Sequence, residues 1–358
     1  MDIMTKVKQI LNRIFIDGLS GMALGLFSTL IVGTIIQQIG KLIGGNIGDT
    51  LFIIGKVAAA LTGAGIGCGV AYKFKESPLV VLSAATAGMV GAFAGQISAG
   101  TVLLESGLIN FAGPGEPLGA FIAAYVAIEI GHLVTGKTKV DILVTPLVSI
   151  VSGSLVGLLI GPKISAFMSG LGAIINLGTE QNAFLMGIIV SVTMGIILTL
   201  PISSAAIGIV LSLSGLAAGA ATVGCCANMV GFAVASFREN KVGGLVAQGI
   251  GTSMLQVPNI VRKPIIWLPA IITSAILGPV ATMVFKMTNN ATGSGMGSAG
   301  LVGQIMTYQT MTVTENPKIV LVKIVVLHFI LPAILAFSIS EIMRKFKWIK
   351  SGDMKLDI

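Results

Sequence analysis

The chain has 358 residues, of which 54% are hydrophobic and only 10% are charged, with a mean hydropathy of +0.97 and a formal net charge of +8. Soluble domains carry about 25% charged residues, so a chain this poor in charge cannot cover a water-facing surface and must use lipid as its solvent. The lysines and arginines are scattered between apolar stretches, which favours basic cytoplasmic loops over binding to nucleic acid. We therefore expect a protein embedded in the lipid bilayer, with no nucleic-acid partner.

Apolar stretches of spanning length follow one another along the first half of the chain. Each has close to the roughly 20 residues that an α-helix needs to cross a bilayer. They comprise residues 18–39, 51–72, 78–97, 118–135 and 142–161. Residues 1–17 precede them with an amphipathic pattern, typical either of a short helix on the membrane surface or of the solvated start of the first span. A last apolar stretch covers residues 319–339.

The charged residues in the loops alternate in sign along the first half. Two loops carry lysines, whereas the loop 98–117 carries glutamates and neither lysine nor arginine; the residues are Lys73, Lys75, Lys137, Lys139, Glu105 and Glu116. Because basic loops stay in the cytoplasm, this pattern places the N-terminus there. The basic residues after the last apolar stretch place the C-terminus on the same side, so the number of crossings is even, and we expect about ten.

The sequence pattern divides the chain into four parts. Residues 1–161 hold five spans, and the less hydrophobic residues 162–183 suggest an interfacial linker helix. The third part is 184–316; from residue 184 to residue 257 its apolar sequence is nearly unbroken but rich in Gly, Ala, Ser and Thr, as expected for re-entrant hairpins or for tightly packed helices of small residues. Within this part, residues 286–300 have the composition of a flexible polar loop. Residues 317–358 contain the last span and a basic cytoplasmic tail.

The segment from residue 243 to residue 269 combines an apolar composition with polar side chains and three prolines. Backbone groups freed by such interruptions at membrane depth must face protein or a water-lined cavity. Interrupted spans are also the best sequence indication of a transporter's binding site. We therefore predict that a polar solute binds here, to Gln248, Thr252, Ser253, Gln256 and Asn259.

A second polar group, near residues 200–232, contributes Ser203, Ser204 and Asn228 to the predicted binding site. Serine in a membrane helix often bonds only to a preceding carbonyl. The alternative for the two serines is therefore a local hydrogen bond without a role in binding. Asparagine is costly to place in hydrocarbon, which favours a functional role for Asn228. Uncharged amides and hydroxyls suit a neutral polyol such as a sugar, because hydroxyl groups need both donors and acceptors.

Two ionisable residues of the fourth span, Glu129 and His132, are three positions apart and share a helix face. They are a candidate proton relay, although both lie near the cytoplasmic end of the span, where they would meet water. The three cysteines lie in Gly/Ala-rich sequence without metal-ligand spacing, and no nucleophile–base pair or phosphate-binding glycine loop stands out. We predict no catalytic residue, no metal site and no cofactor.

Three motifs give the chain a family resemblance over nearly its whole length. They are G-P-G-E-P-L-G-A-F-I at 113–122, K-T-K-V-D-I-L-V-T-P-L at 137–147 and G-I-G-T-S-M-L-Q-V-P at 249–258. The second is similar to the T-K-x-D…P-L that opens the fifth span of many IIC components of bacterial phosphotransferase sugar transporters. The third is similar to the G-I-[TS]-E-x-x-I-P hairpin that lines their sugar site. The chain resembles this family and, more closely, its PfoR-like branch of toxin-regulator membrane proteins.

The resemblance implies an all-α, polytopic fold of about ten transmembrane helices with two re-entrant hairpins, in the bacterial cytoplasmic (inner) membrane. It implies that residues 1–161 form a scaffold with a homodimer contact. Residues 184–316 would hold a sugar-like solute between the hairpins and move by alternating access. A separate IIB protein would supply phosphorylation, and the chain would act as the membrane subunit of a sugar phosphotransferase.

Two departures from the family pattern keep other functions open. The family's sugar-binding glutamate falls where Met254 stands, and no histidine occurs in the sixth span. A methionine cannot accept a strong hydrogen bond from a sugar hydroxyl. The first alternative is therefore a membrane sensor or regulator that has lost transport. The second is a proton- or sodium-coupled carrier, which rests on Glu129 and His132.

Overall fold

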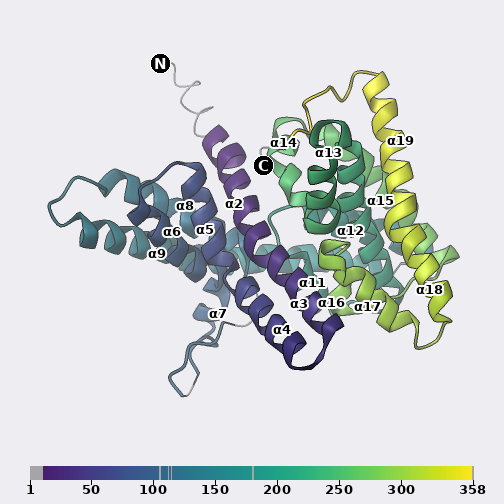
Figure 1. The fold of residues 1–358 in the computed structure, drawn as a ribbon, viewed down its shortest axis with the longest axis horizontal. Coiled ribbons are helices and arrows are strands. Elements are labelled where there is room, and N and C mark those ends of the chain that lie inside the picture. Colours follow the sequence, from purple (N-terminus) through teal and green to yellow (C-terminus); the bar gives the residue numbers. More distant parts are fainter. Residues whose placement is uncertain (1–10, 105, 112, 114, 180, 357–358) are drawn as a thin grey trace. The chain divides into compact units, whose positions relative to one another are not determined.

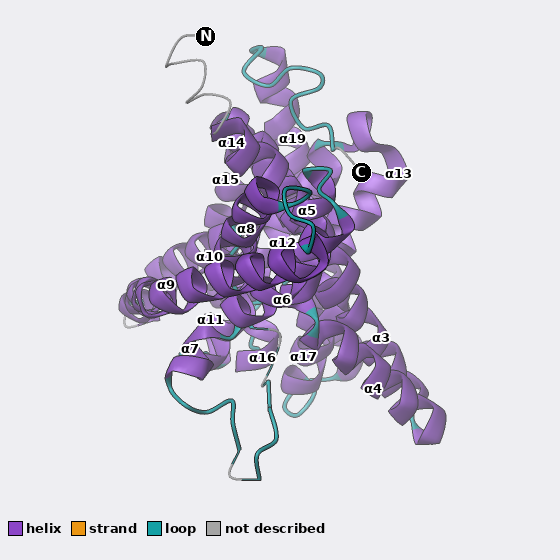
Figure 2. Ribbon diagram, turned by 90° about the vertical axis from the view of Figure 1, so that its left-hand side faces the viewer, coloured by secondary structure: helices purple, strands orange, loops and turns teal. Residues whose placement is uncertain are grey.

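The structure, a computed structural model, describes residues 11–104, 106–111, 113, 115–179 and 181–356. In this part of the chain the regular secondary structure is helical, and Figure 2 shows helices joined by loops with no strand. Two isolated β-bridges, Leu103 with Ile109 and Gly215 with Asn289, do not extend into strands. The prediction of an all-α fold is confirmed. The chain forms two compact units, Met1–Met168 and Ser169–Ile358.

Six of the described helices are long and apolar enough to cross a membrane. They are Arg13–Ile43, Pro117–Val134, Asp141–Ile164, Gly215–Ala235, Pro264–Val284 and Pro317–Lys345. A bent pair of helices, Gly45–Ala60 and Thr62–Lys73, makes a seventh candidate if it is one span broken by 54°. Shorter apolar helices include Pro78–Ala92 and Ala183–Thr199. The prediction of a polytopic membrane protein is confirmed, whereas the number of about ten crossings stays a prediction.

The first unit begins with one continuous helix, Arg13–Ile43, which includes α2 (Leu19–Leu26), α3 (Val32–Ile43) and two π-helical stretches. It is followed by α4 (Gly45–Ala60), α5 (Thr62–Lys73), α6 (Pro78–Ala92), the short α7 (Ala94–Ser98), α8 (Pro117–Val134) and α9 (Asp141–Thr179), whose residues from Ser169 on belong to the second unit. Proline stands at the first position of α6 and of α8, where its fixed φ angle suits a helix start and its missing N–H is not needed. The predicted surface helix of residues 1–17 lies mostly outside the described residues.

Facing glycines set the helix spacing in the first unit. The helix Arg13–Ile43 packs against α4 and α5, and a Cβ added to Gly25 would lie 2.1 Å from the carbonyl oxygen of Gly65. Gly21 and Gly69 face each other in the same way, with 2.6 Å from an added Cβ to the Gly69 carbonyl oxygen. Small residues allow helix backbones to approach closely in a membrane. The high glycine content therefore serves helix packing here.

The helix α9 covers 39 residues and continues through Pro146 and Pro162. The predicted linker helix begins at residue 162, so its described residues up to Thr179 belong to the same helix as the fifth predicted span. Only 22% of the apolar stretch in Asp141–Ile164 is buried within the chain. An apolar helix with so much exposed surface is suited to contact with lipid or with another protein.

The second unit contains longer helices separated by short ones. In chain order they are α10 (Ala183–Thr199), α11 (Ser204–Val210), α12 (Gly215–Ala235), α13 (Phe237–Val246), α14 (Val257–Arg262), α15 (Leu268–Pro279), α16 (Ala291–Ser294), α17 (Val302–Met311), α18 (Pro317–Ile324) and α19 (Leu331–Lys345). The central helix is α12, which packs against α10, α15 and α19 (Figure 1). In this helix 94% of the apolar stretch is buried within the chain.

Three segments of the second unit interrupt its regular helices. The first surrounds α11, the second covers residues 247–267, and the third runs from the end of α15 through α16 to the start of α17. We predicted a flexible polar loop at residues 286–300, and this prediction is wrong because most of the segment is buried. Asn289, Ser294 and Ser298 are each at most 1% exposed. Ser298 Oγ donates to the carbonyl oxygen of Gly249 at 2.5 Å, so a partner distant in sequence replaces solvent.

Candidate functional site

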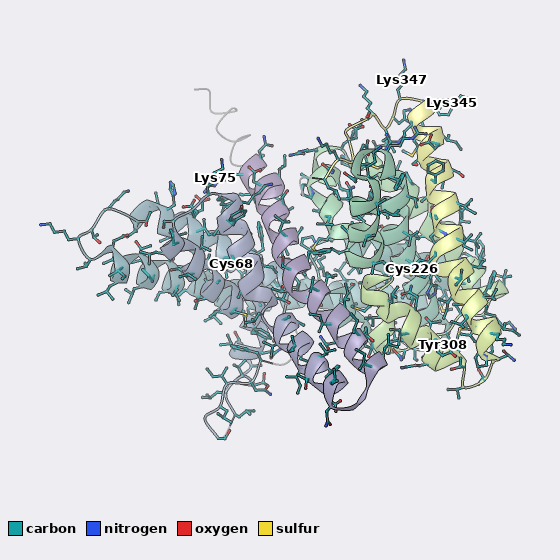
Figure 3. All side chains as sticks on the ribbon, in the orientation of Figure 1. Cys68, Lys75, Cys226, Tyr308, Lys345 and Lys347 are labelled. Atoms are coloured by element: carbon teal, nitrogen blue, oxygen red, sulfur yellow. The ribbon has the colours of Figure 1, made fainter. Side chains whose placement is uncertain are left out.

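The interior of the second unit is organised around α12, whose sequence is almost entirely small and apolar. Small side chains let α10 and α15 approach closely: a Cβ on Gly224 would lie 1.9 Å from the carbonyl oxygen of Ser191 in α10. A helix so enclosed has no water for its polar groups, so each of them needs a protein partner. The polar residues of α12 therefore bond to the surrounding segments. Thr222, Asn228 and the two cysteines are all buried, and Cys226 is labelled in Figure 3.

A first group of polar side chains, the Asn228 cluster, consists of Asn228, Thr199, Ser253, Trp267 and Ser274. Asn228 Oδ1 accepts hydrogen bonds from Trp267 Nε1 at 2.9 Å and from Thr199 Oγ1 at 3.2 Å. Asn228 Nδ2 donates to Ser274 Oγ at 3.1 Å. The hydroxyls of Thr199 and Ser253 lie 2.8 Å apart. The cluster joins α10, α12, α15 and the interrupted segment 247–267, and it carries no charge.

A second group, the amide chain, consists of Gln248, Gln256 and Asn259, which are all buried. Gln248 Nε2 donates to Ser236 Oγ at 2.9 Å. Gln256 Nε2 donates to Gln248 Oε1, and Asn259 Nδ2 donates to Gln256 Oε1, both at 2.9 Å. Spacings of eight and three residues on an interrupted segment thus bring three amides into one continuous hydrogen-bonded row.

The segment that follows α19 is folded onto this amide chain. Gln256 Nε2 donates to the carbonyl oxygen of Met354, and Asn259 Nδ2 to that of Lys355, both at 2.9 Å. Met354 is fully buried. Residues 350–356, which we call the strap, therefore hold two of the predicted solute-binding amides. Lys345 at the end of α19 and Lys347 just after it are labelled in Figure 3.

An ion pair between Lys263 and Asp353 fixes the strap to the segment 247–267. Lys263 Nζ lies 2.5 Å from Asp353 Oδ2. Burial alone would raise the pKa of the Asp353 carboxyl, but hydrogen bonds from Lys263 and from the backbone N–H of Lys350, with the charges of both lysines, bring that pKa below its ordinary value. The carboxylate is therefore the favoured form in the folded protein.

The structure separates the predicted site residues into different surroundings. Asn228 and Ser253 meet in one cluster, and Gln248, Gln256 and Asn259 meet in the amide chain. Ser204 joins neither of these through its hydroxyl bond, which it donates to the carbonyl oxygen of Gly295 at 2.6 Å. Thr252 caps the turn Ser253–Gln256 by accepting a bond from the backbone N–H of Met254. Ser203 lies immediately before α11, and its carbonyl oxygen accepts from Ile207 N.

Several residues that take part in these buried hydrogen bonds were not predicted from the sequence. Thr199, Trp267 and Ser274 complete the Asn228 cluster, and Asn289 Nδ2 donates to Thr222 Oγ1 at 2.8 Å. Trp267 lies within the predicted binding segment 243–269. A buried indole N–H usually has a hydrogen-bond partner, so this tryptophan could have been predicted to join the polar residues. For the others the partner is distant in sequence, and no local pattern points to it.

The predicted relay residues lie in the first unit, where four ionisable side chains form a row. Arg13 Nε donates to Glu129 Oε1 at 2.8 Å, and Arg13 Nη2 to Glu76 Oε1 at 3.3 Å. His132 Nδ1 lies 3.0 Å from Glu76 Oε2. Glu129 and His132 are therefore connected through Arg13 and Glu76. The Glu76 side chain is only 4% exposed, against 37% for Glu129, so the more enclosed of the two acids comes from the loop 74–77. The relay itself stays a prediction.

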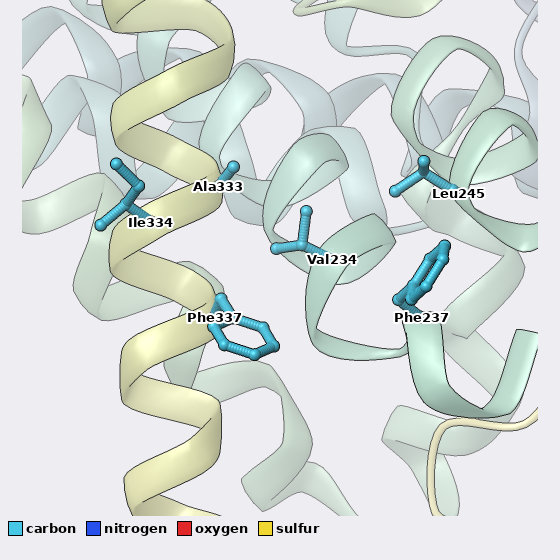
Figure 4. A pocket seen from close by; sticks show the side chains of 6 residues that line it. All are labelled: Val234, Phe237, Leu245, Ala333, Ile334 and Phe337. Carbon is cyan, nitrogen blue, oxygen red and sulfur yellow. The ribbon is translucent and has the colours of Figure 1, made fainter. Parts of the chain in front are cut away.

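An apolar cavity of about 370 Å³ opens between α12, α13 and α19 (Figure 4). Its lining consists of Val234, Phe237, Leu245, Ala333, Ile334 and Phe337. A polar solute needs a few placed donors and acceptors in its pocket, and this lining offers none. The cavity is therefore not the site of a sugar-like solute.

Comparison with known proteins identifies the family of the chain. The family model described as "Phosphotransferase system, EIIC" matches residues 16–356, which is nearly the whole chain. A comparison with curated proteins finds no match. The match agrees with the apolar helices of spanning length in both units. The chain therefore belongs to the EIIC family, the membrane permease components of phosphotransferase systems.

Proposed function

We propose that the chain is a sugar permease subunit that binds a neutral, sugar-like solute at the Asn228 cluster. The observation that supports this proposal is a mostly buried, uncharged set of hydrogen-bonding groups drawn from four segments of an EIIC chain. Ser253 places one edge of the cluster on an interrupted segment. Interrupted segments at membrane depth line the substrate sites of transporters.

The chemistry of the cluster suits hydroxyl groups. Asn228 both donates and accepts, the hydroxyls of Thr199, Ser253 and Ser274 can do either, and the indole of Trp267 donates. A sugar presents many hydroxyls and an apolar ring face, and the half-buried ring of Trp267 offers a matching apolar surface. In the structure the cluster's groups bond to one another. Binding would exchange these internal bonds for bonds to the solute.

The same proposal assigns roles to the rest of the chain. The second unit would carry the solute by alternating access, because its interrupted segments can change packing without exposing backbone to lipid. The first unit, with its facing glycines, would be the scaffold and would supply a homodimer contact. A separate IIB protein would phosphorylate the solute, since the family is a phosphotransferase component.

The test is solute uptake by bacterial cells that lack their own sugar phosphotransferase permeases. Cells expressing the full chain, with a IIB protein supplied, take up radiolabelled sugars in turn, and vesicles from them are assayed with and without phosphoenolpyruvate. We expect one sugar to accumulate in a phosphoenolpyruvate-dependent manner. Ser253→Ala and Asn228→Ala should each lower uptake at least tenfold.

The control is Ser83→Ala in the first unit, whose hydroxyl donates only to the carbonyl oxygen of Leu79. This variant should transport as the unmodified chain does. Each variant is also checked for a monodisperse peak in detergent, so that a misfolded variant is not counted as inactive. Uptake that is unchanged in both Ser253→Ala and Asn228→Ala would contradict the proposed site.

A second candidate function, a solute sensor without transport, is favoured by one observation. Met254 stands where the resemblance places a sugar-binding glutamate, and its side chain is 6% exposed. A thioether there cannot replace a carboxylate as a hydroxyl acceptor. The sensor alternative predicts that a sugar raises the thermal midpoint of the purified protein while uptake stays absent. Restoring the acid with Met254→Glu would then be expected to confer uptake.

A further inference from the structure

A third buried polar group in the second unit is set apart by hydrogen-bonding capacity that stays unused. It consists of Gln304 and Thr307 on α17 and of His328 in the π-helical turn Val325–Ile330 of the last span. Thr307 and His328 are fully buried, and Gln304 is 7% exposed. Turns of π-helix inside α-helices occur frequently at functional sites.

The contacts of this group leave three polar atoms without a partner. Gln304 Nε2 lies 3.2 Å from His328 Nδ1 and 3.3 Å from Cys226 Sγ. In the described part of the chain, Gln304 Oε1, Thr307 Oγ1 and His328 Nε2 have no hydrogen-bond partner, although all three are buried. Buried polar groups are almost always paired, so three exceptions on two touching elements need an explanation.

Thr307 is the most informative of the three because its neighbours show what a threonine does on this helix. Thr310 donates to the carbonyl oxygen of Met306 at 2.8 Å, four residues back along α17. The equivalent acceptor for Thr307 is Gly303 O, which instead accepts from Asn289 Nδ2 at 3.2 Å. The usual local bond of a helical threonine is therefore replaced, and the Thr307 hydroxyl is free for another partner.

The chemistry of the three atoms identifies the class of ligand. Because the amide nitrogen of Gln304 only donates, His328 Nδ1 accepts its bond and the ring proton lies on Nε2. The group thus offers one donor (His328 Nε2), one acceptor (Gln304 Oε1) and one hydroxyl that does both. Hydroxyl groups match this set. An anion would require a positive charge, and a metal ion would be repelled by the N–H of the ring.

The position on α12 separates this group from the Asn228 cluster. Cys226, which contacts Gln304, is two residues from Asn228. Side chains two apart on a helix do not share a face. The two groups therefore lie on different sides of the same central helix.

We propose that Gln304, Thr307 and His328 form a second binding site for a neutral, hydroxyl-bearing molecule, on the side of α12 away from Asn228. The proposal rests on the proposed function, because it takes the same class of solute. Gln304 and Thr307 are three residues apart and share a face of α17. This helix contacts the last span through the hydrogen bond between Gln304 and His328. A solute hydroxyl held there would bond to two helices at once.

The experiment uses the chain's small number of histidines, which is two. His132 is exposed and lies in the first unit, so His132→Gln leaves His328 as a single histidine signal. The full-length variant, labelled with ¹⁵N-histidine and purified in detergent, is titrated with glucose, mannitol, ribitol and glycerol while the NMR signal of His328 Nε2 is followed. We expect at least one of these polyols to shift that signal in a saturable manner.

Two further variants test the assignment. Thr307→Val has nearly the same shape and removes the free hydroxyl, so we expect the apparent affinity for that polyol to fall at least tenfold. Gln304→Met should have the same effect if Thr307→Val fails to fold. Thr310→Val, which removes a locally bonded hydroxyl from the same helix, should titrate as the parent does.

Three results would overturn the inference. The first is a His328 signal that no polyol moves, as expected if water alone satisfies these atoms. The second is a shift that persists in both Thr307→Val and Gln304→Met, and the third is an equal loss in Thr310→Val. If uptake depends on Asn228 while the His328 signal stays unmoved, only the second site is wrong. If uptake and all binding are absent, the proposed permease function is wrong as well.

Discussion

In both units, helices approach each other closely at glycines, where backbone meets backbone. Gly25 faces Gly65 in the first unit, and Gly224 faces Ser191 in the second. The units differ in what else is buried. Among the described residues, the first unit buries hydroxyl residues, Gln38 and the carboxylate of Glu76. The second unit also buries Asn228, several further amides and His328.

The difference extends to the range of the hydrogen bonds. Thr34 and Ser83 of the first unit donate to carbonyl oxygens four residues earlier in the same helix. Asn228 bonds to side chains 29, 39 and 46 positions away. Local bonds hold no tertiary arrangement in place, whereas the long-range ones fix interrupted segments against α12. In the first unit the buried hydroxyls named above bond locally, and long-range side-chain contacts occur in the charged row around Arg13. In the second unit buried amides bond over long range in the interior.

The largest effect is expected from glycine substitutions, and it should be similar in both units. In Gly25→Ala and Gly224→Ala the new methyl group would lie 2.1 Å and 1.9 Å from a backbone oxygen. Backbone cannot move aside as a side chain can, so we expect a loss of more than about 3 kcal/mol of stability. The measurement is the thermal midpoint and the yield of monodisperse protein in detergent.

The matched control for both substitutions is Gly243→Ala in α13. A Cβ there meets nothing within 4 Å, and alanine favours a helix over glycine by about 1 kcal/mol. Its midpoint should equal or exceed that of the unmodified chain. A normal midpoint for Gly25→Ala or Gly224→Ala would mean that the helices are not spaced by their glycines.

The next largest effect should distinguish the units. Asn228→Ala leaves the Trp267 indole N–H and the Ser274 hydroxyl without a side-chain partner. Polar contacts between membrane helices average about 0.6 kcal/mol, but several are lost here, and we expect a cost of about 1.5–3 kcal/mol. Ser83→Ala removes one local bond and should cost less than about 0.5 kcal/mol. Equal midpoints for the two variants would remove the distinction between the units.

A smaller effect concerns the charged row of the first unit. Glu76→Gln weakens contacts to both Arg13 and His132 from a side chain that is 4% exposed, and we expect a cost of about 1–2 kcal/mol. Glu129→Gln affects a shorter bond to Arg13, but the Glu129 side chain is 37% exposed, so its cost should stay below about 1 kcal/mol. The measurement is the thermal midpoint of each variant, Glu76→Gln and Glu129→Gln, at low salt. A larger loss for Glu129→Gln would show that burial does not decide the ranking.

The sequence predicted much of this fold because the forces that make a membrane helix are local. The fourth expected span, 118–135, differs by one residue at each end from α8, Pro117–Val134, since proline marks its start. The last expected span, 319–339, lies within the observed helix Pro317–Lys345. Hydropathy alone cannot locate the charged ends of such a helix, because lysine and arginine extend its last turn.

The site was less predictable, and residues 286–300 show why. A Gly-, Ser- and Asn-rich stretch has the same composition whether it is exposed or buried. Burial was decided by distant partners, such as Thr222 for Asn289 and Gly249 for Ser298. The same holds for the strap, whose carbonyls meet Gln256 and Asn259 almost a hundred residues away in sequence. Residue types were therefore predictable, but their grouping into clusters was not.

The smallest predicted effect tests whether the strap adds an electrostatic contact to the packing of the second unit. Asp353 is a partly buried carboxylate with its pKa held below the ordinary value of about 3.9, mainly by Lys263. A depressed folded-state pKa means that the ion pair stabilises fully above the ordinary pKa and that its contribution is lost as the pH falls through the folded-state pKa. Asp353→Asn should therefore lower the thermal midpoint at pH 7 by an amount equivalent to less than about 1 kcal/mol.

That difference should shrink as the pH falls below about 4, because the unmodified chain then loses the charge that the variant never had. Lys263→Met removes the other partner, and adding it to Asp353→Asn should cost little more than either change alone, because both remove the same interaction. If Asp353→Asn leaves the midpoint at pH 7 unchanged, Asp353 acts through hydrogen bonds that asparagine retains and not through its charge. The strap would then be held by the packing of Met354 and by the amides of Gln256 and Asn259, as the rest of the second unit is held by buried polar contacts.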